Sequence, residues 1–251
     1  MAFLLLHNYT DFIKTVLRKY KNYISEQIKD NYKKVALLVY WLNDYINYIK
    51  NEKSFEPNRN IKYKRGQIVF VNFGFRIGNE LGGRHYAIVL DQNNAPYERT
   101  LTVVPLRSNK NKNTRYHRIY TIALSSNIKA SLYAKATSII DANFKRLIEI
   151  GKQIYNSTSP LDKKTLEKEG AYLKKRSKLA KDILDFAKKL NNGSIADVGQ
   201  ITTISKQRIV HPCKKNDVLT DIIVNSNDME LIEQKIKYLY FTSWYYLLIP
   251  L

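Results

Sequence analysis

The sequence has two apolar runs, Gln67-Ile-Val-Phe-Val-Asn-Phe73 and Tyr86-Ala-Ile-Val-Leu90, on either side of the segment Gly78-Asn-Glu-Leu-Gly-Gly-Arg-His85. β-Branched and aromatic residues dominate both runs, which is typical of strands. The glycines between them allow a tight loop because glycine accepts positive φ angles. We therefore predict two strands joined by a loop that delivers Arg84 and His85 to the start of the second strand.

Further strand-like runs follow this pair. Short strands joined by turns predict a small, strongly curved antiparallel sheet or barrel within an α+β fold. The runs that carry this prediction are Leu101 to Pro105, Tyr116 to Leu124, Leu132 to Ile140 and Ser194 to Ile204.

Apolar residues at helical spacing predict helices around this sheet. Two cover residues 10–53 and meet at Asp30-Asn31, two more span Asn143 to Ile154 and Lys163 to Leu190, and the last starts near Ser226. We therefore expect an N-terminal helical extension over residues 1–60. A barrel domain over 61–251 would follow, with a helical insertion at about 143–192 and a C-terminal helix.

Charge points to a polyanionic partner. The 251 residues include 42 Lys and Arg against 22 Asp and Glu, a formal net charge of +20. Such a field attracts RNA or DNA, although biased genome composition explains part of the lysine content. The single cysteine, Cys213, fits a reducing compartment. Because Met1 to Leu6 resemble no leader peptide and no run is long enough for a membrane span, we expect a cytoplasmic protein.

Three stretches carry candidate chemistry. Arg84 and His85 could hold a phosphate and move a proton. Arg107 and Ser108, at a strand end, could also bind a phosphate. The stretch from Gln200 to Arg208 offers polar groups for RNA. Each stretch alone has an ordinary structural reading: an exposed hairpin, a strand stop before a polar loop, and a half-buried strand.

Taken together and in this order, these stretches resemble the MazF/PemK toxin family. The motifs that carry the resemblance cover about residues 62–140 and 194–245. They are Arg65-Gly66-Gln67, Gly78 to Tyr86, Thr102 to Ser108, and Gln200 to Arg208.

The resemblance implies an SH3-like β-barrel, usually a homodimer, and metal-independent cleavage of single-stranded RNA without a cofactor. It also implies an acidic antitoxin protein as a partner. The sequence departs from the family pattern at five positions. His85 stands where the family has arginine, Tyr86 where proline is usual, Arg107 at a hydroxyl position, Thr202 at a second arginine, and Ser205 at an aspartate.

These correspondences give the expected site. His85, Arg84 and Ser108 are the candidate catalytic residues. The candidate RNA-binding residues are Arg107, Glu80, Gln200, Thr202, His117 and Arg208. Two other classes of function remain open: a catalytically weakened module that binds nucleic acid or protein, and a structural protein in which the helices dominate.

Overall fold

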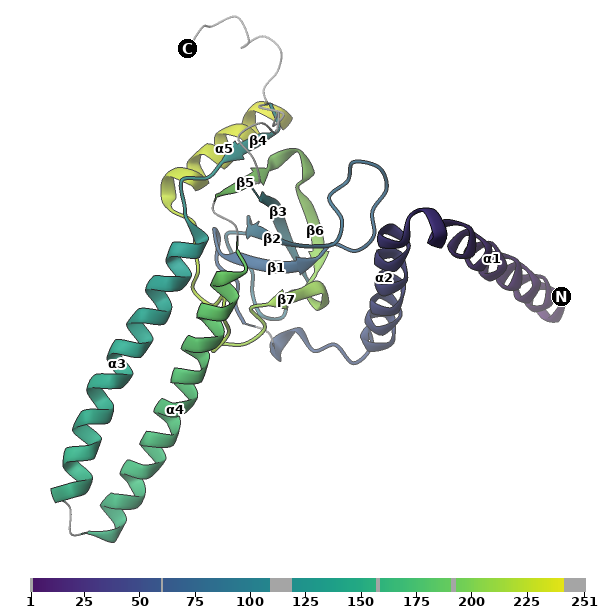
Figure 1. The fold of residues 1–251 in the computed structure, drawn as a ribbon. Helices are drawn as coiled ribbons and strands as arrows, with labels where there is room; N and C mark the ends of the chain where they lie inside the picture. The colour runs from purple at the N-terminus through teal and green to yellow at the C-terminus, as the bar shows by residue number, and fades with distance from the viewer. Residues whose placement is uncertain (1, 60, 109–118, 157–158, 191–192, 242–251) are drawn as a thin grey trace, which may run out of the picture.

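The computed structural model describes residues 2–59, 61–108, 119–156, 159–190 and 193–241. It is an α+β structure in which a bent antiparallel sheet lies between two helical projections (Figure 1). Within the described ranges, no helix combines the length and apolar character that crossing a membrane requires.

The sheet has a continuous order of β4-β5-β3-β2-β1-β7, and β6 also pairs with β3. The strands are β1 Ile68–Asn72, β2 Arg84–Val89, β3 Thr100–Ser108, β4 Thr121–Ala123, β5 Ser194–Asp197, β6 Thr202–Ser205 and β7 Ile209–His211. Every ladder is antiparallel. The predicted antiparallel sheet is therefore confirmed. Over the described residues no ladder joins β4 to β7, so the sheet does not close into a barrel.

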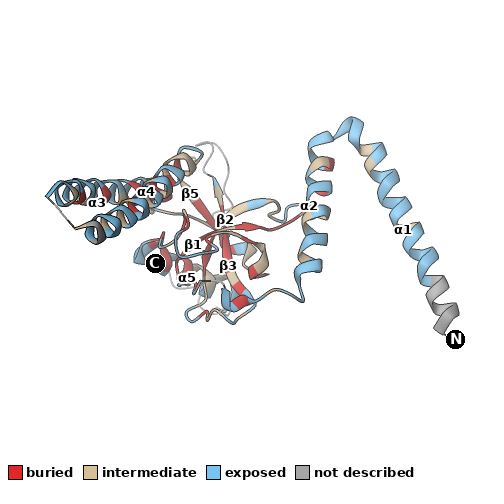
Figure 2. Ribbon diagram, turned by 90° about the horizontal axis from the view of Figure 1, so that it is seen from below, coloured by how far each residue is buried: buried red, intermediate tan, exposed pale blue. Residues whose placement is uncertain are grey.

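Alternation along the strands builds two cores. Successive side chains of a strand point to opposite faces. Ile68 and Ile88 accordingly lie in one buried cluster with the helices α3, α4 and α5, whereas Val69 and Ala87 lie in a second with β6. Burial is concentrated on the strands and on the helix faces that cover them (Figure 2). Side chains on both faces of the sheet are thus buried.

The N-terminal helices form as predicted. α1 spans Ala2–Asp30 and α2 spans Tyr32–Asn51, with the break at Asn31. The short 3-10 turn Pro57–Arg59 then occupies the predicted linker. α2 lies beside the loop between β1 and β2, and α1 projects away from the sheet (Figure 1).

The strand predicted at Leu132 to Ile140 is wrong. Those residues belong to α3, Ile128–Asn156, which forms an antiparallel hairpin with α4, Pro160–Lys188. Buried Ile128, Leu132 and Ala136 recur every fourth residue, which is the helical period. The prediction failed because the β-branched residues near Ile140 are typical of strands. The helical hairpin therefore starts about 15 residues before the predicted boundary of 143.

The helical hairpin connects β4 to β5, two paired strands that a short turn could otherwise join. β4 pairs with β5 antiparallel, from Thr121 opposite Asp197 to Ala123 opposite Ile195. The two helices thus leave and re-enter the sheet at neighbouring points, as an insertion requires.

α5, Ser226–Tyr240, is the predicted final helix. Asn225 caps it by accepting a hydrogen bond from the Asp228 amide at 2.8 Å, the usual role of asparagine at a helix start. The remainder of the predicted C-terminal helix, 242–251, lies outside the described residues.

Candidate active site

Four predicted site residues meet where β2 begins and β3 ends. Arg84, His85, Arg107 and Ser108 line one cavity of about 170 Å³, here called the strand-end cavity. Its other walls are Tyr86, Leu106, the start of α3, and residues 190, 193 and 194. Ala87 pairs with Pro105, so the same antiparallel register carries His85 to the level of Arg107 on one face of the sheet. The sequence alone could not show that these two segments lie together, because their proximity depends on the register between β2 and β3.

A buried carboxylate orients Arg107. Both Nε and Nη2 of Arg107 lie 2.7 Å from Oδ2 of Asp197. The Asp197 side chain is only 6% exposed, and that of Arg107 is 42% exposed. The guanidinium is therefore fixed at its inner edge and open to solvent at its outer edge, where it could bind a phosphate oxygen. Sequence reasoning missed Asp197, which lies inside the strand predicted from Ser194 to Ile204 and is the last residue of β5.

The start of α3 adds two groups that the sequence analysis also missed. Asn127 and Lys129 line the strand-end cavity. The Asn127 side chain accepts a hydrogen bond from the Ala130 amide at 3.0 Å, so it caps the helix. The first peptide N–H groups of a helix favour anions, and Lys129 adds a charge. This region was missed because the segment after it was assigned to a strand.

Arg84 and Tyr86 have different environments at the edge of the cavity. The Arg84 side chain is 58% exposed, and its Nη2 lies 3.3 Å from Oδ2 of Asp44 in α2. Tyr86 packs against Phe70 and Phe186, with ring centroids 4.9 and 6.0 Å away. Burial raises the pKa of Tyr86 well above its ordinary value, so its phenol stays neutral.

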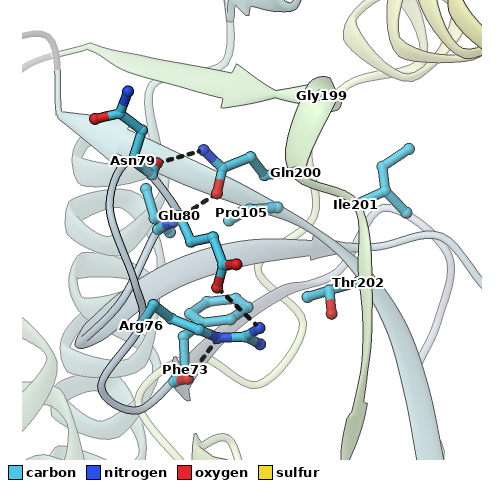
Figure 3. A pocket seen from close by; sticks show the side chains of 10 residues that line it. Phe73, Arg76, Asn79, Glu80, Pro105, Gly199, Gln200, Ile201 and Thr202 are labelled. Atoms are coloured by element: carbon cyan, nitrogen blue, oxygen red, sulfur yellow. Dashed lines mark hydrogen bonds and ion pairs between the residues drawn. The ribbon is translucent and has the colours of Figure 1, made fainter.

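Glu80, Gln200 and Thr202 gather at a second cavity of about 350 Å³, here called the loop cavity (Figure 3). It lies between the β1–β2 loop, Pro105 of β3 and the segment that leads into β6. Glu80 forms an ion pair with Arg76 at 3.6 Å. The predicted residues thus form two groups, one at each cavity, and β3 contributes Pro105 to one cavity and Leu106 to the other.

Gln200 holds the glycine-rich loop. Its Oε1 accepts a hydrogen bond from the Leu81 amide at 2.5 Å, and its Nε2 donates to the Asn79 carbonyl at 3.0 Å (Figure 3). These two bonds fix the loop just before β2. The structure therefore supports a positioning role for this residue, where the sequence suggested RNA contact.

Of the last two predicted residues, only Arg208 belongs to the described part of the chain, and it lines neither of these two cavities. Arg208 donates from Nε to the Asn72 carbonyl at 2.8 Å, and its guanidinium lies 5.3 Å from the Trp41 ring centroid. It therefore joins the turn before β7 to α2. Burial lowers the pKa of Arg208. His117 lies outside the described residues.

The first motif of the resemblance is structural. Arg65 Nη2 lies 2.6 Å from Glu233 of α5, and the same guanidinium also donates to the Leu90 carbonyl. Gly66 has a φ of +77°, which glycine adopts without strain. The motif therefore ties the start of β1 to the last helix.

The strand-end cavity combines an imidazole, two guanidiniums, an ammonium, two serine hydroxyls and a helix start. Such a set can bind a phosphodiester and transfer a proton to or from it. In the part of the chain that the structure describes, no cluster of three His, Cys, Asp or Glu side chains has the spacing of a metal site.

Comparison with known proteins points to the same family as the sequence resemblance, but the match continues into the predicted insertion and does not reach residues 194–245. Residues 64–175 match a family model described as the PemK-like, MazF-like toxin of type II toxin-antitoxin systems. The matched range holds β1 to β4, α3 and the first half of α4. The chain matches none of the curated proteins with which it was compared.

Proposed function

We propose, from the match of residues 64–175 to the PemK-like, MazF-like toxin family, that the protein is the toxin of a toxin–antitoxin pair. Its activity is metal-independent cleavage of single-stranded RNA. The observation that carries the proposal is the convergence of His85, Arg84, Arg107 and Ser108 on the strand-end cavity.

In this reaction the ribose 2′-hydroxyl attacks the adjacent phosphorus, and its proton passes to a base. The bond from phosphorus to the 5′-oxygen breaks, and the leaving oxygen takes a proton. The products are a 2′,3′-cyclic phosphate and a 5′-hydroxyl. His85 is the acid/base group, because imidazole exchanges protons near neutral pH. Arg84, Arg107 and Ser108 stabilise the charged transition state.

The remaining features of the proposal follow from the family. The bent sheet corresponds to an SH3-like barrel, the active form is a homodimer, and an acidic antitoxin neutralises it in the cytoplasm. The net charge of +20 suits both the RNA and the acidic partner.

A second candidate function is RNA binding without cleavage. It is favoured by the replacement of the family's arginine with His85 and of a hydroxyl with Arg107. Arg84 and Arg107 are also both paired with carboxylates, those of Asp44 and Asp197.

One assay separates the two candidates. Purified protein is incubated with a labelled single-stranded RNA in EDTA, alongside His85→Ala and Arg84→Ala variants. Cleavage that His85→Ala abolishes supports the enzyme. Binding without cleavage by the wild-type protein supports the second candidate. If Arg84→Ala alone abolishes cleavage, Arg84 and not His85 takes the family's arginine role.

A further inference from the structure

A third and larger cavity lies between α2 and the loop from Asn72 to Arg84. Its volume is about 960 Å³, and we call it the helix cleft. It shares Arg76 with the loop cavity and Arg84 with the strand-end cavity. The helix cleft therefore borders both cavities that hold the predicted site residues, one at Arg76 and the other at Arg84. One of its walls comes from α2, which precedes the matched residues 64–175.

Aromatic side chains form much of the lining. Of the fifteen lining residues, four are aromatic: Tyr23, Tyr40, Trp41 and Phe75. Tyr40 is 73% exposed, so its ring is accessible to a ligand. Exposed planar rings are the surfaces on which unpaired bases stack.

Several contacts fix α2 against the loop on the other side of the cleft. The Trp41 ring lies against Gly74, where an added Cβ would come within 2.6 Å of ring atoms. The Arg208 guanidinium covers the ring at 5.3 Å, a cation–π contact. Asn72 donates from Nδ2 to Oδ2 of Asp44 at 2.9 Å. The aromatic surface is thus preorganised relative to the loop, which lowers the entropic cost of binding.

The lining charge is positive. Three lining residues are basic, Lys34, Arg76 and Arg84, and one is acidic, Asp44. Asp44 forms an ion pair with Arg84 at the end of the cleft nearest the strand-end cavity. A phosphate that entered there would compete with this carboxylate for the guanidinium.

We propose that the helix cleft is a subsite for single-stranded RNA, which binds the nucleotides that extend from the phosphate held in the strand-end cavity. A base stacks on the exposed ring of Tyr40 on α2, which Trp41 holds against the loop. Lys34 and Arg76 contact the backbone. The inference rests on the proposed function. RNA is favoured over an acidic peptide because exposed rings and cations line the cleft, and Arg84 lines both the cleft and the candidate phosphate site.

The test uses the full chain and a single-stranded RNA with 2′-O-methyl groups throughout, which cannot be cleaved by 2′-hydroxyl attack. Its affinity is measured by fluorescence anisotropy. Tyr40→Ala should lower affinity about 10-fold, since one stacked base is worth about 1–3 kcal/mol. Tyr40→Phe should bind like the wild type. Tyr155→Ala is the matched control, because Tyr155 is 90% exposed on the far part of α3.

The outcomes keep this inference separate from the proposed function. Equal affinities for Tyr40→Ala and wild type would overturn the subsite, even if unmodified RNA is cleaved. Weaker binding by Tyr40→Ala would support the subsite even if wild-type protein cleaves nothing. A polyglutamate peptide that binds as tightly as the RNA, and loses as much affinity in Tyr40→Ala, would overturn the assignment to RNA.

Discussion

At the scale of single residues, the ion pair of Arg107 and Asp197 joins β3 to β5 and fixes one of the proposed site residues. Arg107→Leu leaves a buried carboxylate without its partner, so we expect the free energy of unfolding to fall by about 1–3 kcal/mol. Urea denaturation at neutral pH measures this loss. Adding Asp197→Asn should recover part of it, since the unpaired charge is then gone. Strictly additive losses in the double variant would show that the two residues are not coupled.

Asp44 offers a second test at this scale. Its carboxylate pairs with Arg84, and it also accepts a hydrogen bond from Asn72. Asp44→Asn removes the charge and can still accept that bond. We expect this variant to bind uncleavable single-stranded RNA several-fold more tightly, because Arg84 becomes available to phosphate. Anisotropy titration measures the change, and unchanged or weaker binding would place Arg84 outside the RNA contact.

At the scale of elements, Asp228 joins α5 to the segment between β4 and α3. Its carboxylate accepts hydrogen bonds from Ser125 and Ser126 at 2.8–2.9 Å. Burial acts to raise the pKa of Asp228, but these bonds together outweigh it and hold the pKa below the ordinary value of 3.8. Because the pKa is lower in the folded state, the charged carboxylate stabilises the fold at pH values above the ordinary pKa of 3.8. This stabilisation is lost as the pH falls through the folded-state pKa.

We expect the stability of wild type and of Asp228→Asn to depend differently on pH. Asp228→Asn should be less stable than wild type at pH 7, and the gap should narrow as pH falls from about 5 to below 3.8. Thermal melts across this range measure it. A gap that is constant with pH would show that the charged form is not specifically stabilised.

The helical hairpin divides into a core part and a projecting part. Ile128, Leu132 and Ala136 of α3 and Ile183 of α4 lie in the same buried cluster as the sheet residues. Farther out, Asn143 joins the helices by donating to Leu173 and Ser177. Replacing residues 145–171 with a short Gly/Ser link should therefore leave a folded protein, whereas removing 128–188 should not. Circular dichroism and melting curves distinguish the two, and failure of the shorter deletion would place the tip in the folding core.

Local patterns predicted most of these elements, and they failed where a choice depended on tertiary contacts. The break at Asn31, the strands at residues 68–72 and 84–89, and the start of α5 follow from spacing and capping residues. The run at Leu132 to Ile140 contains β-branched residues that suit a strand, and only its packing against the sheet makes it helical. Asp197, Asn127 and Lys129 could not be assigned to the site, because strand register and helix docking bring them there.

At the scale of the whole molecule, charge should govern RNA binding. Contacts between phosphates and Lys or Arg release counterions, so affinity falls steeply with salt. With a net charge of +20, we expect at least a 10-fold loss of affinity for uncleavable RNA between about 50 and 200 mM salt. A nearly flat dependence would count against RNA as the partner.

The central claim is that the ends of β2 and β3 form a site that cleaves RNA by 2′-hydroxyl attack. Mass spectrometry of the fragments that wild-type protein and His85→Ala produce from single-stranded RNA in EDTA tests it most directly. We predict 2′,3′-cyclic phosphate and 5′-hydroxyl ends from the wild type and intact RNA from the variant. Fragments with 3′-hydroxyl and 5′-phosphate ends, or equal cleavage by both proteins, would contradict the claim.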